Sequence, residues 1–134
     1  MSVSERIAQF LSAEGFAVAG ASTNRDKYGN KVLRCYMQQG KRVIPINPHA
    51  PAVEGLASVA SISDLPDDVQ SLSIITPPAI TEQVVEAAIA KGIRNVWMQP
   101  GAQSAKAMAR CEEAGINLIA DGSCLLVVLG YHDA

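Results

Sequence analysis

The sequence contains few of the residues from which metal sites and disulfide frameworks are built. Its 134 residues include two histidines and three cysteines, and Cys35, Cys111 and Cys124 show no C-x-x-C spacing. Zinc sites depend on closely spaced Cys and His ligands, and three cysteines cannot all pair with one another. We therefore expect no metal site and a reduced protein.

Neither sign of charge is in large excess. Eleven Lys and Arg residues against thirteen Asp and Glu give a net charge of −2. This balance provides no overall attraction to nucleic acid or to an anionic membrane, so any basic site must be local. No apolar run reaches the length of about 18 residues that suggests a membrane span, and residues 1–4 lead directly into an amphipathic helix. We expect a cytoplasmic protein that binds neither nucleic acid nor membrane.

Two common nucleotide-binding motifs are also missing. In a dinucleotide fingerprint, G-x-G-x-x-G is followed about 20 residues later by an acid that binds the ribose. Here Ser22 stands in place of the second glycine, the next glycine is Gly29, and the second expected strand ends in Asn47 and Pro48 without a carboxylate. The pattern G-x-x-x-x-G-K-[ST] is absent as well. These gaps disfavour NAD binding and argue against nucleotide hydrolysis, although an NAD(P)- or FAD-dependent enzyme remains one alternative.

What the sequence does contain is a repeated alternation of amphipathic helix, glycine and short apolar strand. Ser4 and Ser104 are candidate N-caps, and glycines end the helices. Aromatic residues are scarce while small aliphatic residues are common, which suits helices packed closely on a sheet. Such alternation predicts an α/β fold, a three-layer, doubly wound, Rossmann-like parallel sheet in one domain over residues 1–134. The strands are expected at 16–19, 43–46, 72–75, 96–98 and 116–120.

Ligands of a doubly wound sheet bind at the carboxyl ends of its strands. The residues expected at those ends are small hydrogen-bonding groups and proline, with Asp121 as the one carboxylate, for which a turn role is the simpler interpretation. Such an edge suits the holding of a ligand better than acid–base chemistry. The first loop, with Arg25, Lys27 and Lys31 in or beside it, favours an anionic ligand, unless these cations are ordinary surface residues.

Five motifs at the expected strand ends resemble those of the small stand-alone CoA-binding proteins. These proteins are similar to the nucleotide-fold domain at the start of the succinyl-CoA synthetase alpha subunit. Each motif is weak by itself, but the five occur in order over nearly the whole chain. They are G-A-S-x-N at 20–24, K-Y-G at 27–29, I-N-P at 46–48, T-P-P at 76–78 and V-W-M-Q-P-G at 96–101.

The resemblance implies a site for coenzyme A or acyl-CoA across the strand ends. His49 stands where a lysine or arginine is common in the family, and Lys41 and Arg42 begin a strand at the opposite edge. The synthetase reacts through a phosphorylated histidine in a second domain, which has no counterpart here, so the resemblance implies binding without catalytic residues, possible regulation and an unknown partner. The implied ligand-binding residues are Gly20, Ala21, Ser22, Thr23, Asn24, Arg25, Lys27, Asn47, Pro48, His49, Thr76, Pro77, Gln99 and Pro100.

Several other residues allow two interpretations. Cys124 is either a thiol that faces CoA or senses oxidation, or a buried structural thiol, which we favour. Trp97 suits the core better than contact with adenine, and His132 suits a flexible tail. The apolar stretch at 124–130 either completes the core or forms the interface of a homodimer. The last possibility belongs to a third hypothesis, a ligand-free interaction module.

Overall fold

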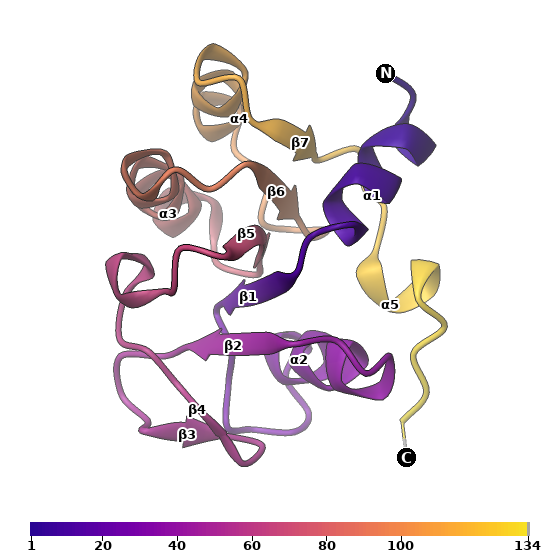
Figure 1. Ribbon diagram of the computed structural model, residues 1–134, viewed down its shortest axis with the longest axis vertical. Coiled ribbons are helices and arrows are strands. Elements are labelled where there is room, and N and C mark those ends of the chain that lie inside the picture. The colour runs from indigo at the N-terminus through magenta and orange to yellow at the C-terminus, as the bar shows by residue number, and fades with distance from the viewer. Residues whose placement is uncertain (134) are drawn as a thin grey trace.

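A parallel sheet of five strands runs through the centre of the molecule in a computed structural model that describes residues 1–133 (Figure 1). The strand order is β2-β1-β5-β6-β7, and each neighbouring pair is parallel. All five strands predicted from the sequence are present, although β5 begins three residues earlier than expected. The strands are β1 (Gly15–Ala19), β2 (Val43–Ile46), β5 (Val69–Ile74), β6 (Asn95–Met98) and β7 (Asn117–Ile119).

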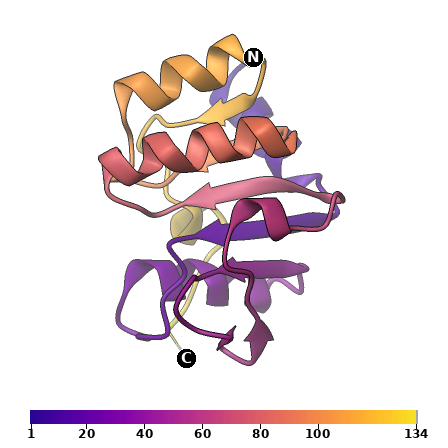
Figure 2. The same cartoon turned by 90° about the vertical axis from the view of Figure 1, so that its left-hand side faces the viewer.

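Helices cover both faces of the sheet, which confirms the three-layer, doubly wound architecture (Figures 1 and 2). One core cluster joins Leu72 to Val85 and Ala107, and the other joins Trp97 to Phe10 and Val32. On the first face lie α3 (Pro78–Lys91), α4 (Ala105–Glu113) and the short 3-10 helix η1 (Ile62–Asp64). On the second lie α1 (Val3–Leu11), α2 (Tyr28–Gln38) and α5 (Leu125–Val128).

Trp97 belongs to the core, as the sequence suggested. Its side chain is fully buried, its ring meets that of Phe10 edge to face at 5.4 Å between centroids, and its Nε1 donates to Ser123 O at 2.9 Å. A buried indole normally needs such an acceptor. The ring is therefore held on the α1 side of the sheet.

The start of α1 differs from the prediction. Ser2, and not Ser4, is the N-cap: its Oγ accepts from Glu5 N, and Glu5 Oε1 accepts from Ser2 N, both at 3.1 Å. This reciprocal capping box requires a Glu three residues after the cap. Ser2 meets this requirement, because Glu5 stands three residues after it, and Ser4 does not. The predicted cap of α4 is confirmed, since Ser104 Oγ accepts from Ala107 N at 3.2 Å.

A ladder of buried polar side chains, which the sequence did not reveal, ties α1 to the sheet. Ser71 Oγ donates to Phe10 O at 2.7 Å, and Asn95 Nδ2 donates to Ser71 Oγ at 3.1 Å. Asn117 Nδ2 continues the ladder to Asn95 Oδ1 at 3.1 Å and to Arg6 O at 2.9 Å. Linked side chains of three adjacent strands thus bind two carbonyls of α1, and one of these, Phe10 O, is among the last four carbonyls that the helix itself leaves unpaired.

A small hairpin, β3 (Ala52–Val53) with β4 (Leu56–Ala57), follows β2 and was not predicted. Its two-residue turn is Glu54-Gly55, and both residues have positive φ, 52° and 79°. Two consecutive residues with positive φ form a tight turn whose twist matches that of the two strands it joins. Asn, Asp or Gly is the usual residue at the position of Glu54 in such a turn. The pattern was missed because the strands are too short to alternate and the turn residue is unusual.

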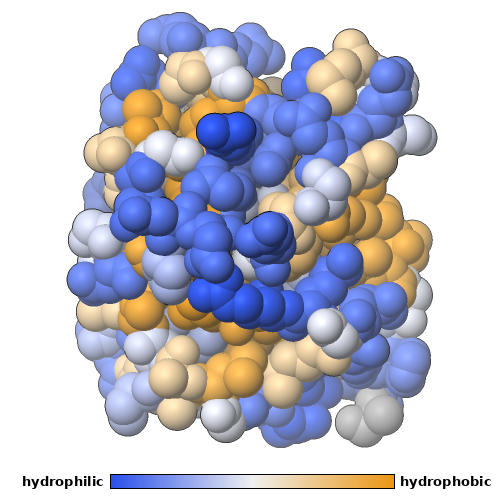
Figure 3. Space-filling view, viewed as in Figure 1, coloured by the Kyte–Doolittle hydropathy of each residue, from blue (hydrophilic) through white to orange (hydrophobic). Residues whose placement is uncertain are grey.

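The C-terminal segment lies against α2. Leu125 is fully buried, so α5 completes the core, while Val127 is 79% exposed. Figure 3 shows an apolar surface at the right, the side on which α5 lies in Figure 1. The tail that was expected to be flexible is held instead: Gln38 Nε2 donates to His132 O at 2.7 Å, and Arg34 binds Asp133 at 3.2 Å. Homodimer formation stays a prediction. No helix of residues 1–133 has the length and apolar character needed to cross a bilayer.

Candidate functional site

A cavity of about 430 Å³ opens at the carboxyl ends of β2, β1 and β5. β2, the next strand of the sheet along the chain, lies on one side of β1, and β5 lies on the other side. The strand order therefore reverses between β1 and β5, and the cavity lies at this point. Ligands of such sheets bind in the crevice that this reversal creates. The cavity therefore lies at the edge that the sequence predicted.

Six of the predicted site residues line this cavity. Gly20 and Ala21 form one wall at the end of β1, and Thr76 stands beyond the end of β5. The rest of the lining is mostly apolar and comes from η1 and α3, including Ile62, Ile80 and Val84. An apolar pocket with a few polar groups at its rim is typical of a ligand site. The six predicted residues are Gly20, Ala21, Asn47, Pro48, His49 and Thr76.

The contributions of η1 and α3 were not recognised from the sequence. Ile80 and Val84 lie four residues apart on one face of α3 and resemble ordinary core positions. In the structure Ile80 is 43% exposed, because this part of α3 extends past the sheet edge. The i, i+4 spacing identifies the face of a helix but not whether a strand lies beneath it.

Two glycines hold the cavity wall close to the start of α2. Gly20 has φ 95°, a backbone conformation that favours glycine. A Cβ on Gly29 would lie only 1.9 Å from Gly20 O, so α2 begins in direct contact with the end of β1. The lengthened glycine spacing noted in the sequence thus serves the same close packing that a third fingerprint glycine provides.

The loop between these glycines is fixed by its own side chains. Ser22 Oγ accepts from Asn24 N, and Asn24 Oδ1 accepts from Asp26 N, each at 3.0 Å. Asn30 Nδ2 also donates to Ser22 O at 2.8 Å. These contacts are the local turns that Ser and Asn favour, and they shape the loop without lining the cavity. Thr23 is exposed on the same loop.

The cations of the loop differ in what they contact. Arg25 pairs with Glu54 of the hairpin turn, and Lys31 lies 3.8 Å from Asp133. Lys27, at the N-cap position of α2, forms no ion pair with any of residues 1–133, and its side chain does not cap the helix. The first turn of this 11-residue helix contains no acid. A free Lys at the positive end of an uncapped helix suits an anion.

Asn47 connects the loops after β1 and β2. Its Nδ2 donates to Ala21 O at 3.0 Å, while its Oδ1 accepts from His49 N at 2.8 Å and from Ala50 N at 3.1 Å. Its side chain therefore fixes the rim and leaves Pro48 and His49 exposed upon it. An amide is suited to this position because it both donates and accepts.

The segment after β5 serves mainly as a helix entry. Pro77 is the N-cap residue of α3 and Pro78 its first residue, as expected for proline at the start of a helix. Thr76 Oγ1 lies 2.8 Å from the Oγ1 of the buried Thr81. Pro77 does not line the cavity, and its observed role is at the entry to α3.

Gln99 and Pro100 lie apart from the cavity. Gln99 is fully buried beneath α5, where its Oε1 accepts from Tyr28 Oη at 3.2 Å and from Leu125 N at 2.9 Å. Burial, and secondarily Cys124, raises the pKa of Tyr28, so its phenol stays neutral. Pro100 is exposed. The predicted residues outside the cavity lining are Ser22, Thr23, Asn24, Arg25, Lys27, Pro77, Gln99 and Pro100.

Two of the other sequence interpretations can now be settled. Asp121 is a turn acid: its Oδ1 accepts from Ser123 N at 3.0 Å, and the contacts with Ser123 lower its pKa. Cys124 is not the buried structural thiol that we favoured, because it is partly exposed, with its Sγ 2.6 Å from Tyr28 Oη. Leu125, the first residue of α5, is buried, whereas Cys124, the N-cap residue of that helix, stays at the edge.

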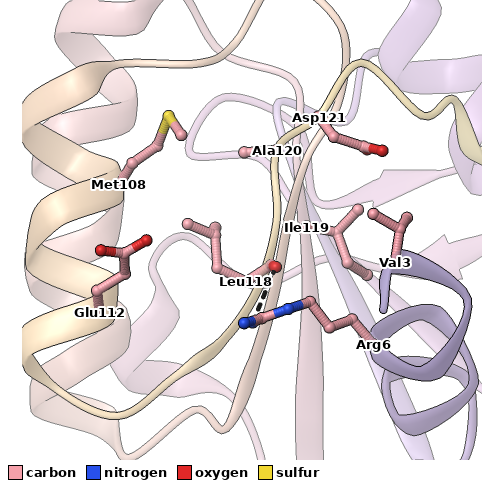
Figure 4. A pocket seen from close by; sticks show the side chains of 8 residues that line it. All are labelled: Val3, Arg6, Met108, Glu112, Leu118, Ile119, Ala120 and Asp121. Carbon is pink, nitrogen blue, oxygen red and sulfur yellow. Dashed lines mark hydrogen bonds between the residues drawn. The ribbon is translucent and has the colours of Figure 1, made fainter. Parts of the chain in front are cut away.

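A second hollow, of about 260 Å³, lies between α1 and α4 beside β7 (Figure 4). Arg6 reaches into it and donates from Nη1 to Leu118 O at 3.4 Å, across from Glu112. It contains none of the predicted ligand-binding residues. Among residues 1–133, no group of three or more His, Cys, Asp or Glu side chains lies close enough to hold a metal ion.

The fold and the cavity define a class, the α/β domains that bind a nucleotide-like ligand at a strand-order reversal. The particular family follows from comparison: the CoA binding domain model matches residues 14–130, and the chain belongs to that family. The resemblance seen in the five motifs is thereby confirmed.

Individual relatives agree with this assignment. Over 88 residues the chain is 30% identical to the alpha subunit of an ADP-forming acetate–CoA ligase II from Pyrococcus furiosus, a match that covers 65% of this chain but only 19% of the subunit. A conserved hypothetical protein from Pyrococcus furiosus is similar in structure, with TM-score 0.82 and 36% identity over 86% of this chain and 98% of that one. A hypothetical protein from Pyrococcus horikoshii OT3 is also similar in structure, with a TM-score of 0.87 and 27% identity, and the match covers 95% of this chain and 89% of that one.

Proposed function

We propose that this protein binds coenzyme A or acyl-CoA at the carboxyl edge of its sheet without transforming it. The observation that carries the proposal is the cavity at the strand-order reversal, which adjoins the uncapped start of α2 with Lys27. Its apolar lining suits a nucleobase, and the adjoining helix start suits phosphate. The membership in the CoA binding domain family supports the same ligand.

The residues at this edge support binding more than catalysis. Acid–base chemistry needs a titratable side chain within reach of the reacting group. His49 is the one titratable side chain among the residues that line the cavity, and no second acid or base accompanies it in that lining. Asp121 is engaged in its own turn, and the side chains of Ser22, Asn24 and Asn47 are occupied in shaping loops. A domain of this kind holds CoA for regulation or for a partner that supplies the chemistry.

Calorimetric titration with CoA, acetyl-CoA and NAD tests the proposal. CoA and acetyl-CoA should each bind at one site per chain, and NAD should not. Lys27→Ala should weaken CoA binding about tenfold or more, since a charge-assisted contact contributes about 1.5–3 kcal/mol. Lys41→Ala is the matched control, because Lys41 lies over the Phe16 ring at the opposite edge.

Two results would contradict the proposal. One is the absence of heat with millimolar CoA from a folded protein. The other is mass spectrometry of small molecules released from the purified protein that finds stoichiometric NAD or flavin and no CoA. The second result would instead favour an enzyme that uses a dinucleotide.

A further inference from the structure

Three polar side chains from distant parts of the sequence meet at the same sheet edge as the cavity. Cys124 Sγ lies 2.6 Å from Tyr28 Oη, which in turn lies 3.2 Å from Gln99 Oε1. Tyr28 is the first residue of α2, Gln99 follows β6, and Cys124 precedes α5. Tyr28 also directly follows Lys27, so the cluster adjoins the proposed phosphate site.

One atom of this cluster lacks a hydrogen-bond partner. Gln99 Nε2 is buried and donates to no atom of residues 1–133. The carboxamide cannot simply be reversed, because Leu125 N donates to its oxygen. A buried donor without an acceptor costs about 1–3 kcal/mol, a cost that an acceptor brought by a ligand would remove. The pantetheine arm of CoA contains amide carbonyls, which are acceptors of the required kind.

Cys124 also differs from the other two cysteines in its access to solvent. Cys35 and Cys111 are fully buried, and burial raises the pKa of each thiol to about 11. Cys124 is partly exposed. Because disulfide exchange requires access to the attacking sulfur, Cys124 is the cysteine positioned to react.

The thiol of a bound CoA can reach this cluster. β1 and β6 are separated by β5, so their ends lie two strand spacings, or roughly 10 Å, apart. The pantetheine arm is about as long as four extended residues, or roughly 14 Å. A CoA whose phosphates lie at the start of α2 therefore has sufficient length to bring its sulfur to Cys124.

We propose that Cys124 forms a mixed disulfide with CoA, an inference that rests on the proposed CoA site. The Cys124 sulfur attacks one sulfur of CoA disulfide. The bond between the two CoA sulfurs breaks as the new bond to Cys124 forms, and the second CoA leaves as a thiolate that takes up the proton released by Cys124. Cys124 is oxidised, the departing sulfur is reduced, and CoA disulfide is the oxidant.

Intact-protein mass spectrometry after incubation of the reduced protein with CoA disulfide tests this step. One CoA should be added per chain and be removed by dithiothreitol. Cys124→Ser should form no adduct, while the matched variant Cys35→Ser should form it as the unmodified protein does. CoA disulfide should react about tenfold or more faster than glutathione disulfide, and excess acetyl-CoA should slow the reaction by occupying the site.

Equal rates with the two disulfides, or no slowing by acetyl-CoA, would overturn the inference, because Cys124 would then be merely an accessible thiol. Attachment of CoA to Cys35 or Cys111 would overturn it as well. Titration of Cys124→Ser with CoA separates the two proposals. If CoA binds this variant and the unmodified protein yet no adduct forms, only the disulfide inference fails; if CoA binds neither protein, the proposed function fails.

Discussion

At the scale of single residues, the cavity depends on the absence of a side chain at Gly29. The first turn of α2 rests on Gly20 O, and a Cβ at Gly29 would approach that oxygen to 1.9 Å. Gly20 O is a backbone atom, and a Cβ is fixed directly to the backbone, so neither can rotate away. The close approach sets where the positive end of α2 stands relative to the cavity wall.

Gly29→Ala should therefore destabilise the protein by about 3 kcal/mol, at the upper end of the usual cost of overpacking. Urea denaturation measures this loss. Gly92→Ala is the matched control: Gly92 has φ 84° with open space around its Cβ position, so it should cost only about 1 kcal/mol of backbone strain. Equal losses in the two variants would show that the contact with Gly20 relaxes freely.

The sequence predicted the edge of the sheet at which the cavity opens, but not what each side chain there contacts. Gly20, Asn47 and Thr76 were found because parallel strands bring the residues that follow them to one edge. The contact by which Asn47 fixes the rim is made to Ala21 O, 26 residues away, and no local pattern predicts it. The contact of Tyr28 with Cys124 spans 96 residues, and no local pattern reports it.

At the scale of elements, the hairpin β3–β4 is joined to the start of α2 through one carboxylate. Glu54 accepts from Asn30 Nδ2 at 3.1 Å and pairs with Arg25. These contacts hold Glu54 in the left-handed conformation that the turn requires and that an L side chain adopts only at a cost. The sequence showed neither the hairpin nor its partner, whereas the sheet strands were evident from their apolar runs.

The contacts of Glu54, first with the Asn30 amide and then with Arg25, lower its pKa below 4.5. Because the folded pKa is the lower one, Glu54 stabilises the fold above pH 4.5, and this contribution is lost as the pH falls through the folded value. In Glu54→Gln the free energy of unfolding should therefore be lower near pH 6 and fall less between pH 5 and about 3. Urea titrations at several pH values measure this.

Glu14→Gln is the control for this prediction, since Glu14 is exposed and makes no hydrogen bond or ion pair with any of residues 1–133. Its curve should run parallel to that of the unmodified protein. If the Glu54→Gln curve is also parallel, the carboxylate does not anchor the hairpin.

The polar ladder makes a prediction about α1. Asn95→Ala removes the acceptor of Asn117 and the donor to Ser71, and should cost about 2 kcal/mol in the free energy of unfolding. Amide hydrogen exchange in α1 should accelerate more than in α3, because the ladder ends on α1 carbonyls. Gln9→Ala, an exposed change on α1, should stay within about 0.5 kcal/mol. Uniform acceleration in both helices would indicate general destabilisation instead.

At the scale of the whole molecule, the strand order places the cavity between two groups of elements. β2, β1 and the hairpin lie on one side of the reversal, and β5 with α3 on the other. The doubly wound class was predictable from the alternation of helices and strands. The volume of the cavity was not, because it depends on where the side chains of α3 and η1 lie around the strand ends.

A ligand held by both groups should stabilise the entire fold. At a CoA concentration of 100 times its Kd, the free energy of unfolding should rise by about 2.7 kcal/mol, which raises Tm by roughly 10 °C for a chain of this size. Differential scanning fluorimetry measures the shift, and NAD at the same concentration should leave Tm unchanged. An unchanged Tm with saturating CoA would argue against a site that spans the reversal.

The attachment of the C-terminal residues to α2 has a practical consequence for handling the protein. Arg34 binds Arg25 O at 2.7 Å with one nitrogen and Asp133 with another, so the last residues and the loop at the ligand edge share one guanidinium. We expect an affinity tag fused after residue 134 to disturb the contact between Arg34 and Asp133 and thereby to change the measured Kd for CoA. For quantitative titrations, a tag should precede Met1, because the start of α1 is capped by the hydrogen bonds between Ser2 and Glu5.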